Sequence, residues 1–119
     1  MNSISVIIVN WYSSDYIEKL LGNLKSKAQH HDDIRIVIID NTNGKDMSIE
    51  KIASHDSNIT LHKLDSKGYT SSRGHSYALN YAMKFISTEY ALIIDPDVHI
   101  FKEHWDSFCI EQLNRHNCI

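Results

Sequence analysis

The stretch Tyr90–Ile100, YALIIDPDVHI, decides the fold of this chain. Its apolar run from Ala91 to Ile94 ends abruptly in two carboxylates, Asp95 and Asp97, which flank the only proline in the sequence. A short apolar run that ends at a turn signal predicts a buried strand of a parallel sheet. Acidic side chains at the C-terminal end of such a strand lie where open α/β sheets bind their ligands. Two acids so close together can share one divalent cation, or divide between a cation and a sugar hydroxyl.

Similar runs occur three times before this stretch. Ile4–Val9 and Ile34–Ile39 are apolar and rich in β-branched residues, which predicts two more buried strands. Ile59–Leu64 alternates in part and predicts a further strand, while Tyr90–Ile94 is the last of the main set. Val98–Phe101 is expected to form a short edge strand.

Helical periodicity fills the intervals between these strands. The first helix is expected to be capped by Ser14 or Asp15, and Asp15 and Glu18 have capping-box spacing. Ile17 and Ala28 bound its run of apolar residues at helical spacing. Two other expected helices are Met47–Ala53 and Trp105–Arg115. Between them, a further helix is expected to be capped by Ser71 or Ser72. Its inward face consists of Ala78, Tyr81, Ala82, Phe85 and Ile86.

Strands that alternate with helices predict a three-layer α/β/α, Rossmann-like domain with a mostly parallel sheet. Short connections and right-handed crossovers favour the strand order 3-2-1-4, which reverses between strands 1 and 4. Asp40, the loop at Asn10 and Trp11, and Asp95 would then follow three neighbouring strands. Neighbouring strands are about 4.8 Å apart, so these features would span about 10 Å, the length of a nucleoside.

The bulk composition describes one soluble domain spanning residues 1–119. The chain is 42% hydrophobic and 23% charged, with a net charge of −3, and so has no basic footprint for nucleic acid. Cys109 and Cys118 are expected to be reduced thiols of a cytoplasmic protein. Residues 1–10 lack the basic start of a signal peptide. Membrane association would depend on a part of the protein outside this sequence.

Three side chains near the strand ends are candidates for binding a nucleotide. Asp40 can accept a hydrogen bond from a base N–H, although an acid at a strand end is also a common turn residue. Trp11 offers a flat face for stacking on a base, and is otherwise a core aromatic. Its loop has no glycine, which argues against a dinucleotide fingerprint or a P-loop. Arg73, at a helix start, suits an anion such as a diphosphate, or is a solvated surface residue.

A metal at Asp95 and Asp97 would be held by oxygen ligands, which favours Mg²⁺ or Mn²⁺. His99 is close enough in sequence to be a third ligand. The eight histidines have none of the Cys/His spacing of a zinc site.

With these residues located, the chain resembles the family 2 glycosyltransferases, nucleotide-sugar enzymes of the GT-A fold. The segments that carry the resemblance are Ser5–Trp11, Ile36–Asn41, Gly68–Gly74 and the D-x-D sequence Asp95–Asp97. The resemblance implies that a nucleotide-sugar donor is bound by Val9, Asn10, Trp11, Asp40, Arg73 and Asp95, and Mn²⁺ or Mg²⁺ by Asp97 and Asp95. In this pattern Asp40 meets the base, Asp95 the ribose, and Asp97 the metal that bridges the diphosphate.

The resemblance also implies inverting transfer of a sugar from a UDP-type donor to a sugar, lipid or protein acceptor. The chain departs from the family pattern at Ser66, Gly74 and Ser76, which loosens the assignment of Arg73 to the diphosphate. Only Val98–Ile119 follow the D-x-D sequence, whereas the acceptor half and the catalytic base of the family lie many tens of residues beyond it. No residue is therefore assigned as the base, and transfer by this chain is expected to be weak or absent.

Two other functions fit parts of the pattern. An apolar strand followed by D-x-D also resembles the haloacid-dehalogenase phosphatases, whose first acid attacks phosphorus; these need a downstream lysine and acid pair that the chain has no room for. A degenerate α/β module that binds a nucleotide or only a protein is the non-enzymatic alternative. Such a module could expose apolar surface and form a homo-oligomer through it.

Overall fold

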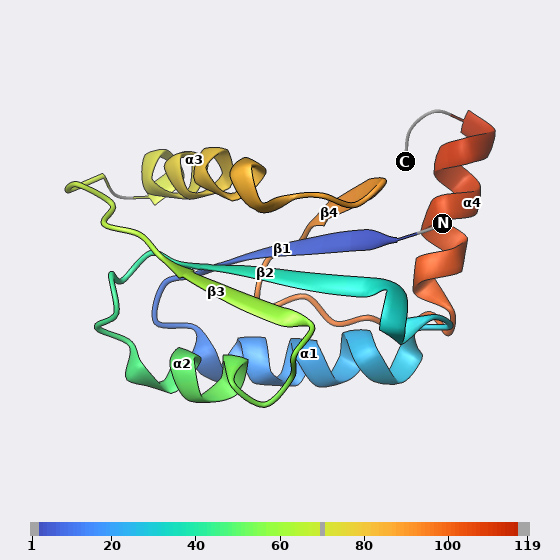
Figure 1. Cartoon of the computed structure of the whole chain (residues 1–119), viewed down its shortest axis with the longest axis horizontal. Coiled ribbons are helices and arrows are strands. Elements are labelled where there is room, and N and C mark those ends of the chain that lie inside the picture. Colours follow the sequence, from blue (N-terminus) through green and yellow to red (C-terminus); the bar gives the residue numbers. More distant parts are fainter. Residues whose placement is uncertain (1–2, 70, 117–119) are drawn as a thin grey trace.

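The structure of the chain is a computed structural model that describes residues 3–69 and 71–116. Four strands form its sheet: β1 (Ile4–Asn10), β2 (Ile34–Asp40), β3 (Ile59–Lys63) and β4 (Tyr90–Ile93). They pair in the order β3-β2-β1-β4, and all three pairings are parallel. This confirms the predicted strand order and the α/β class, and puts the ends of β2, β1 and β4 side by side (Figure 1).

Helices cover both faces of the sheet (Figure 1). Helices α1 (Ser14–Lys27) and α2 (Met47–Ala53) lie on one face, and α3 (Ser71–Ala82) lies on the other. Helix α4 (Trp105–His116) stands at the end of the sheet where the strands begin, next to β1 and the chain start. Short 3-10 turns precede β2 at residues 31–33 and follow α3 at residues 83–85. No helix in the described ranges has the length and apolar character needed to cross a membrane.

The starts of α1 and α3 differ in how far they can be compared with the sequence predictions. The N-cap of α1 is Ser13, not Ser14 or Asp15, and its side chain makes no capping hydrogen bond. The expected capping box is therefore wrong, because the turn after β1 begins the helix one residue earlier than the sequence pattern suggests. Helix α3 begins at Ser71, and Thr70 before it lies outside the described residues. Cys118 also lies outside them.

The predicted edge strand at Val98–Phe101 is wrong, since this segment is irregular. After Pro96 the chain turns, with the Val98 amide donating to the Asp95 carbonyl at 3.2 Å. The chain then leaves the sheet and runs back past α1 toward α4 (Figure 1). The Ile100 amide donates to the Asn23 side chain of α1, so the backbone donor that an edge strand would use is already occupied.

Alternation along the strands builds two cores. Val6, Ile8, Ile36 and Ile38 pack with Ile17 and the other buried residues of α1 and α2 on one face. On the other face, a second cluster packs against α3; its buried members are Ile7, Val9, Val37, Ile39, Leu64, Ala78 and Ala82. Even-numbered residues of β1 and β2 therefore face α1 and α2, and odd-numbered residues, the other parity, face α3. This division also determines where the side chains at the strand ends point.

The end of α1 and its connection to β2 are held against α4 by two buried side chains. The indole Nε1 of Trp105 donates to the Leu24 carbonyl at 2.9 Å, inside the core on the α1 face. The carboxylate of Asp106 accepts from the backbone amides of Gln29 and His30, at 2.8 and 2.9 Å. Burial alone would raise the pKa of Asp106, but these backbone hydrogen bonds outweigh it and hold the pKa below its ordinary value.

Candidate functional site

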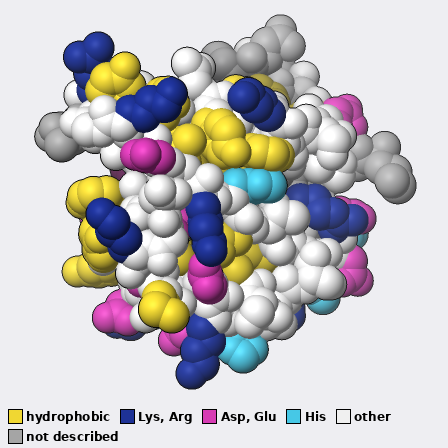
Figure 2. All heavy atoms as spheres, turned by 60° about the vertical axis from the view of Figure 1, so that its left-hand side comes forward, with side chains coloured by type: hydrophobic (Ala, Val, Ile, Leu, Met, Phe, Trp, Pro, Cys, Tyr) yellow, Lys and Arg dark blue, Asp and Glu magenta, His cyan; other side chains and the backbone are white. Residues whose placement is uncertain are grey.

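A cleft of about 470 Å³ lies at the end of the sheet where the strands finish, on the α3 side. This end is at the left of Figure 1, and Figure 2 turns it toward the viewer. Basic, acidic and hydrophobic side chains are interspersed on the visible face (Figure 2), so an anion bound here relies on partners close to it. The cleft is lined by Val9, Trp11, Ser13, Asn41, Tyr69, Gly74, His75, Asp95 and Pro96.

Three of the predicted donor residues meet in this cleft: Val9, Trp11 and Asp95. Val9 belongs to the core on the α3 face, and Trp11 and Asp95 have the parity that continues this face beyond β1 and β4. Trp11 is 57% exposed, so one face of its indole is free to take a flat ligand. The Tyr12 ring packs against it in a T-shaped arrangement, with the ring centroids 5.0 Å apart at an interplanar angle of 77°.

The turn that presents Trp11 is built without glycine. Tyr12 adopts the left-handed backbone conformation, with φ 54°, directly after the strand. The Ser13 amide donates to the Asn10 side-chain oxygen at 3.0 Å, and the Ser13 hydroxyl to the Trp11 carbonyl at 3.0 Å. Asn10 therefore orders the loop that carries the stacking residue, although its own side chain is buried and does not line the cleft.

Asp40 lies outside the cleft, contrary to the position that the sequence suggested for it. It is fully buried and has the parity of the face that packs on α1 and α2. Its Oδ1 accepts from the Asn10 side chain at 3.2 Å and from the amide and hydroxyl of Thr42 at 3.1 and 2.7 Å. Its Oδ2 accepts from the Gly44 amide at 3.0 Å. Both oxygens accept hydrogen bonds from within the chain and the side chain is fully buried, so Asp40 orders the turn after β2 and does not line the cleft.

Asn10 links this turn to α2. Its Nδ2 donates to Asp40 and also to Asp46 Oδ2, at 3.1 Å. Asp46 in turn caps α2 by accepting from the Ser48 amide at 3.2 Å. Buried carboxylates require such satisfied partners. Asn10 and Asp40 are thus the scaffold beneath the cleft, and the sequence reasoning placed them in it because it ignored which face each residue occupies.

Arg73 is exposed and is not among the residues that line the cleft. Its guanidinium stacks over the Tyr69 ring, 4.6 Å from the centroid. Tyr69 itself lines the cleft, so Arg73 contacts a cleft residue without lining the cleft. His75, two residues later, faces the cleft instead. At the start of α3, His75 therefore lines the cleft and Arg73 does not, while the contact of Arg73 with a diphosphate stays a prediction.

Gly74 allows α3 to approach the end of β2 closely. A Cβ at this position would lie 3.0 Å from the Tyr69 carbonyl oxygen and 3.6 Å from the Asn41 amide nitrogen. The Gly74 carbonyl accepts a hydrogen bond from Asn41 Nδ2 at 3.2 Å. A side chain here would crowd the Tyr69 carbonyl of the loop before α3, whereas the distance to Asn41 is that of an ordinary contact.

The second acid of the D-x-D sequence, Asp97, is exposed on the turn after β4 and does not line the cleft. Asp95 is exposed as well but does line it. His99 packs its ring against Phe101, with centroids 4.6 Å apart. Within residues 3–69 and 71–116, no three His, Cys, Asp or Glu side chains gather as a metal site, so His99 does not join the two acids. Asp95 and Asp97 are the carboxylates that could hold a cation at the cleft entrance.

Six residues that line the cleft were not assigned a binding role from the sequence: Ser13, Asn41, Tyr69, Gly74, His75 and Pro96. The position of Asn41 was predictable from the sequence. Val37 and Ile39 alternate toward the α3 face, and the next residue in this alternation is Asn41. Tyr69 and His75 are positioned by the loop before α3 and by its first turn, for which the sequence has no comparable periodic signal.

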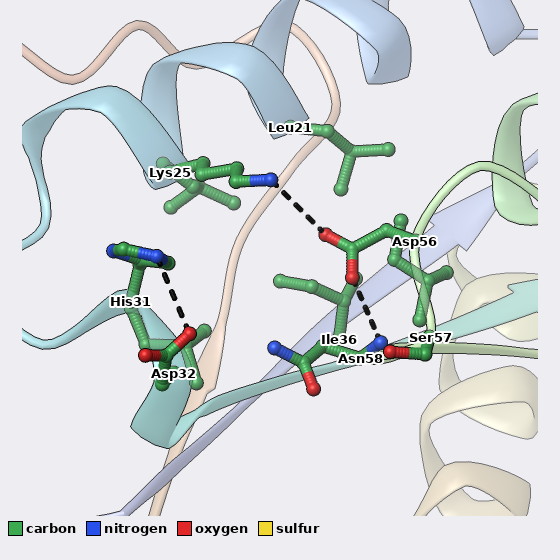
Figure 3. Close-up of a pocket in the computed structure, with 11 residues that line it drawn as sticks. Leu21, Lys25, His31, Asp32, Ile36, Asp56, Ser57 and Asn58 are labelled. Carbon is green, nitrogen blue, oxygen red and sulfur yellow. Dashed lines mark hydrogen bonds and ion pairs between the residues drawn. The ribbon is translucent and has the colours of Figure 1, made fainter.

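A second, smaller pocket of about 200 Å³ lies between α1 and the connection from α2 to β3 (Figure 3). It is at the other end of the strands from the D-x-D sequence. Its polar groups pair with one another: Lys25 Nζ lies 3.9 Å from Asp56, and the other Asp56 oxygen accepts from the Asn58 amide at 2.8 Å. His31 pairs with Asp32 at 3.3 Å. With these groups already satisfied, the pocket offers a ligand little specific recognition, and the larger cleft is the candidate site.

Comparison with known proteins identifies the family and the fold of the chain. The family profile described as "Glycosyl transferase family 2" matches residues 5–119. The chain is 28% identical over 104 residues to the low-salt glycan biosynthesis hexosyltransferase Agl10 of Haloferax volcanii, covering 87% of this chain and 30% of that protein. It is 26% identical over 117 residues to the teichoic acid poly(glycerol phosphate) polymerase of Staphylococcus epidermidis, covering 96% of this chain and 15% of that protein.

Solved structures show the same fold. S. aureus TarS 1-349 superposes with a TM-score of 0.73 at 24% identity, covering 97% of this chain and 33% of that one. The mannosyltransferase PcManGT from Pyrobaculum calidifontis, in complex with GDP-Man and Mn²⁺, superposes with a TM-score of 0.73 at 23% identity, covering 92% and 32%. The chain thus has the GT-A type of α/β fold and spans a third or less of the length of these relatives.

Proposed function

Because the chain belongs to glycosyl transferase family 2, we propose that its cleft binds the nucleoside diphosphate part of a sugar donor. The observation that carries this proposal is the meeting of Trp11 and Asp95 in one cleft at the strand ends. An exposed aromatic face and a carboxylate, several ångströms apart across neighbouring strands, suit a base and a ribose respectively. Ligand binding at this edge is also what an open α/β sheet favours.

Each residue has a distinct task in this proposal. Trp11 stacks on the base, and Val9 supplies apolar floor beneath the nucleoside. Asp95 accepts hydrogen bonds from ribose hydroxyls. Asp97, exposed on the following turn, binds the divalent cation, either alone or together with Asp95. Oxygen ligands of this kind fit Mn²⁺ or Mg²⁺, which when bound would neutralise diphosphate charge and act as a Lewis acid toward the departing group.

The structural relatives support this assignment of ligand class. TarS has been solved in complex with UDP and with UDP-GlcNAc, and PcManGT with GDP-Man and Mn²⁺. We propose a UDP-type donor with a divalent metal, and hexosyl transfer with inversion as the reaction to which the domain contributes. The acceptor and the catalytic base are not assigned to any residue of this chain. The phosphatase alternative is set aside, since the family match extends over residues 5–119.

A calorimetric titration tests the proposal. UDP, GDP and dTDP are titrated into the protein with and without Mn²⁺, and we expect UDP to bind with an affinity that Mn²⁺ increases. Replacement Asp97→Ala should remove the metal-dependent increase and leave the metal-free affinity unchanged. The matched control is Asp32→Ala, whose side chain is 90% exposed beside the smaller pocket at the other end of the sheet.

Two results would count against the proposal. Absence of binding by all three nucleotides overturns the donor site itself. Binding that Mn²⁺ strengthens equally in the wild type and in Asp97→Ala overturns the role of the D-x-D sequence but retains the nucleotide cleft.

A further inference from the structure

Exposed aromatic side chains continue beyond the cleft, from the end of β1 into the start of α1. Tyr12 is 56% exposed and Tyr16 is 59% exposed, and neither lines the cleft that holds Trp11. Tyr16 lies in the first turn of α1, four residues after Tyr12. A single exposed apolar residue is ordinary on a protein surface, whereas neighbouring ones mark a binding surface.

The segment after the D-x-D sequence brings a further apolar side chain to the same helix. The Ile100 amide donates to the Asn23 side chain, and the His104 amide donates to the Lys27 carbonyl at 2.7 Å. The segment therefore runs along α1 in the direction of the helix. Val98, which precedes Ile100 and is 40% exposed, lies nearer to the start of α1. We call Tyr12, Tyr16 and Val98 the shelf.

The backbone of Tyr12 is held in a conformation that bulky residues rarely adopt, with φ 54°. Such residues persist where the surrounding structure fixes them, and they are common at ligand sites. Here the Ser13 amide donates to the buried side chain of Asn10, which is itself bound to Asp40 and Asp46. A buried polar network thus holds the turn that exposes Trp11 and Tyr12 together.

The D-x-D turn lies between the cleft and the shelf. Asp95 lines the cleft, Asp97 is exposed outside it, and Val98 follows directly. Continued beyond its last pair, Ile7 and Ile93, the register of β1 with β4 puts this turn next to the loop of Trp11 and Tyr12. A transfer reaction needs its two substrates side by side. A second substrate on the shelf would lie beside the cation proposed at Asp97.

The charges around the shelf favour a neutral ligand that carries hydroxyl groups. Asp15 and Glu18 of α1 and Asp97 of the turn are exposed acids, against one exposed base, Lys19. These acids disfavour a phosphorylated ligand or an anionic lipid surface, because like charges repel. Their oxygens accept hydrogen bonds from hydroxyl groups. Tyrosine rings combine an apolar face with a polar hydroxyl, which suits a sugar ring that has C–H groups on its faces and hydroxyls at its edge.

We propose that the shelf binds a neutral saccharide, with a pyranose ring packed on Tyr12 and Tyr16, as the acceptor of the sugar carried by the donor in the cleft. This inference rests on the proposed function and adds the class of the second substrate. Donor and acceptor then occupy two adjoining surfaces with the D-x-D turn between them.

An NMR titration with neutral oligosaccharides tests the shelf. Maltotriose, mannotriose and chitotriose are added to ¹⁵N-labelled protein, with and without saturating UDP and Mg²⁺. We expect at least one of them to shift the amide signals of Tyr12, Tyr16 and Val98. The variant combines Tyr12→Asn, since asparagine tolerates a positive φ, with Tyr16→Ala.

This double variant should bind the saccharide at least about fivefold more weakly, because aromatic contacts are lost. It should retain the wild-type affinity for UDP, because neither ring lines the cleft. The control is Phe108→Ala, which removes a 43% exposed aromatic ring from α4 at the other end of the sheet. It should bind both ligands as the wild type does.

The outcomes separate this inference from the proposed function. If UDP binds and none of the three saccharides shifts the shelf signals, the inference is overturned and the nucleotide site stands. Equal saccharide affinities in the double variant and in Phe108→Ala overturn it as well. Cosedimentation with phosphatidylcholine vesicles, without saccharide binding, would assign the shelf to a membrane surface instead. Saccharide binding on the shelf without any UDP binding overturns the proposed function and removes the acceptor role.

Discussion

At the residue scale, neighbouring side chains at the end of β2 have different tasks. Asp40 faces the α1 side and accepts four hydrogen bonds from within the chain. Asn41 faces the α3 side and lines the cleft. The difference of one residue moves a side chain from the scaffold to the binding surface, because side chains alternate between the faces of a sheet.

Replacing the scaffold acid should therefore reduce stability. Asp40→Ala leaves the amides of Thr42 and Gly44 and the side chain of Asn10 without their acceptor. We expect the free energy of unfolding to fall by at least about 2 kcal/mol, because buried donors are left unpaired. Urea unfolding followed by circular dichroism measures this. The exposed Asp33→Ala is the control, and a loss in Asp40→Ala no larger than in the control would contradict the scaffold role.

Replacing Trp11 should weaken nucleotide binding and leave stability nearly unchanged, the opposite of replacing Asp40. Its indole is 57% exposed, so Trp11→Ala should change stability by no more than about 0.5 kcal/mol. It should weaken UDP binding by about 1–3 kcal/mol, the contribution of an aromatic stacked on a base. Titration calorimetry measures the affinity, and Tyr16→Ala is the control, since Tyr16 is 59% exposed on α1 and outside the cleft. Equal affinities in the two variants would rule out stacking on Trp11.

At the scale of elements, α4 is fixed to the turn between α1 and β2 by Asp106. Asp106→Ala leaves the amides of Gln29 and His30 without an acceptor, and should lower the free energy of unfolding by about 1–3 kcal/mol. The folded pKa of Asp106 lies below its ordinary value of 3.8, so its stabilisation is present above that pH. It is lost as the pH falls through the folded pKa.

Unfolding curves from pH 7 to pH 2 measure this effect. We expect the difference in stability between the wild type and Asp106→Ala to be constant at neutral pH and to shrink in acid. Glu111→Ala, an exposed acid of the same helix, is the control. A difference that grows as the pH falls would have the wrong sign and would contradict the assignment.

The elements that the sequence predicted well are those with a periodic apolar pattern. The strands at the start and middle of the chain and helix α2 were found within a residue, because each buries a continuous apolar face. Val98–Phe101 was mistaken for a strand because it contains apolar residues, yet Val98 and Phe101 are 40% and 82% exposed. Its course depends on the hydrogen bond from the Ile100 amide to Asn23 of α1, a partner from a distant part of the chain that leaves no local pattern.

At the scale of the whole molecule, the predicted strand order is confirmed, and it brings the ends of β2, β1 and β4 together, where Val9, Trp11 and Asp95 line one cleft. The order was predictable because crossover rules limit the topology of alternating strands and helices. The binding roles of these residues stay predictions. Asp40 and Arg73 do not line the cleft, because the Asp40 side chain points into the turn after β2 and Arg73 packs on Tyr69. Their contacts with a donor stay predictions. Strand order thus decides which loops meet, and side-chain direction decides which residues of those loops reach a ligand.

The central claim is that a nucleoside diphosphate binds in the cleft at the strand ends, and an NMR titration tests it most directly. Addition of UDP with Mg²⁺ should shift the backbone amides of Trp11, Asn41, Gly74 and Asp95, and replacement by Mn²⁺ should broaden the signal of Asp97. The amides around the opposite pocket, at Lys25, Asp56 and Asn58, should not move. Shifts confined to that pocket, or no shifts at saturating UDP, would contradict the account.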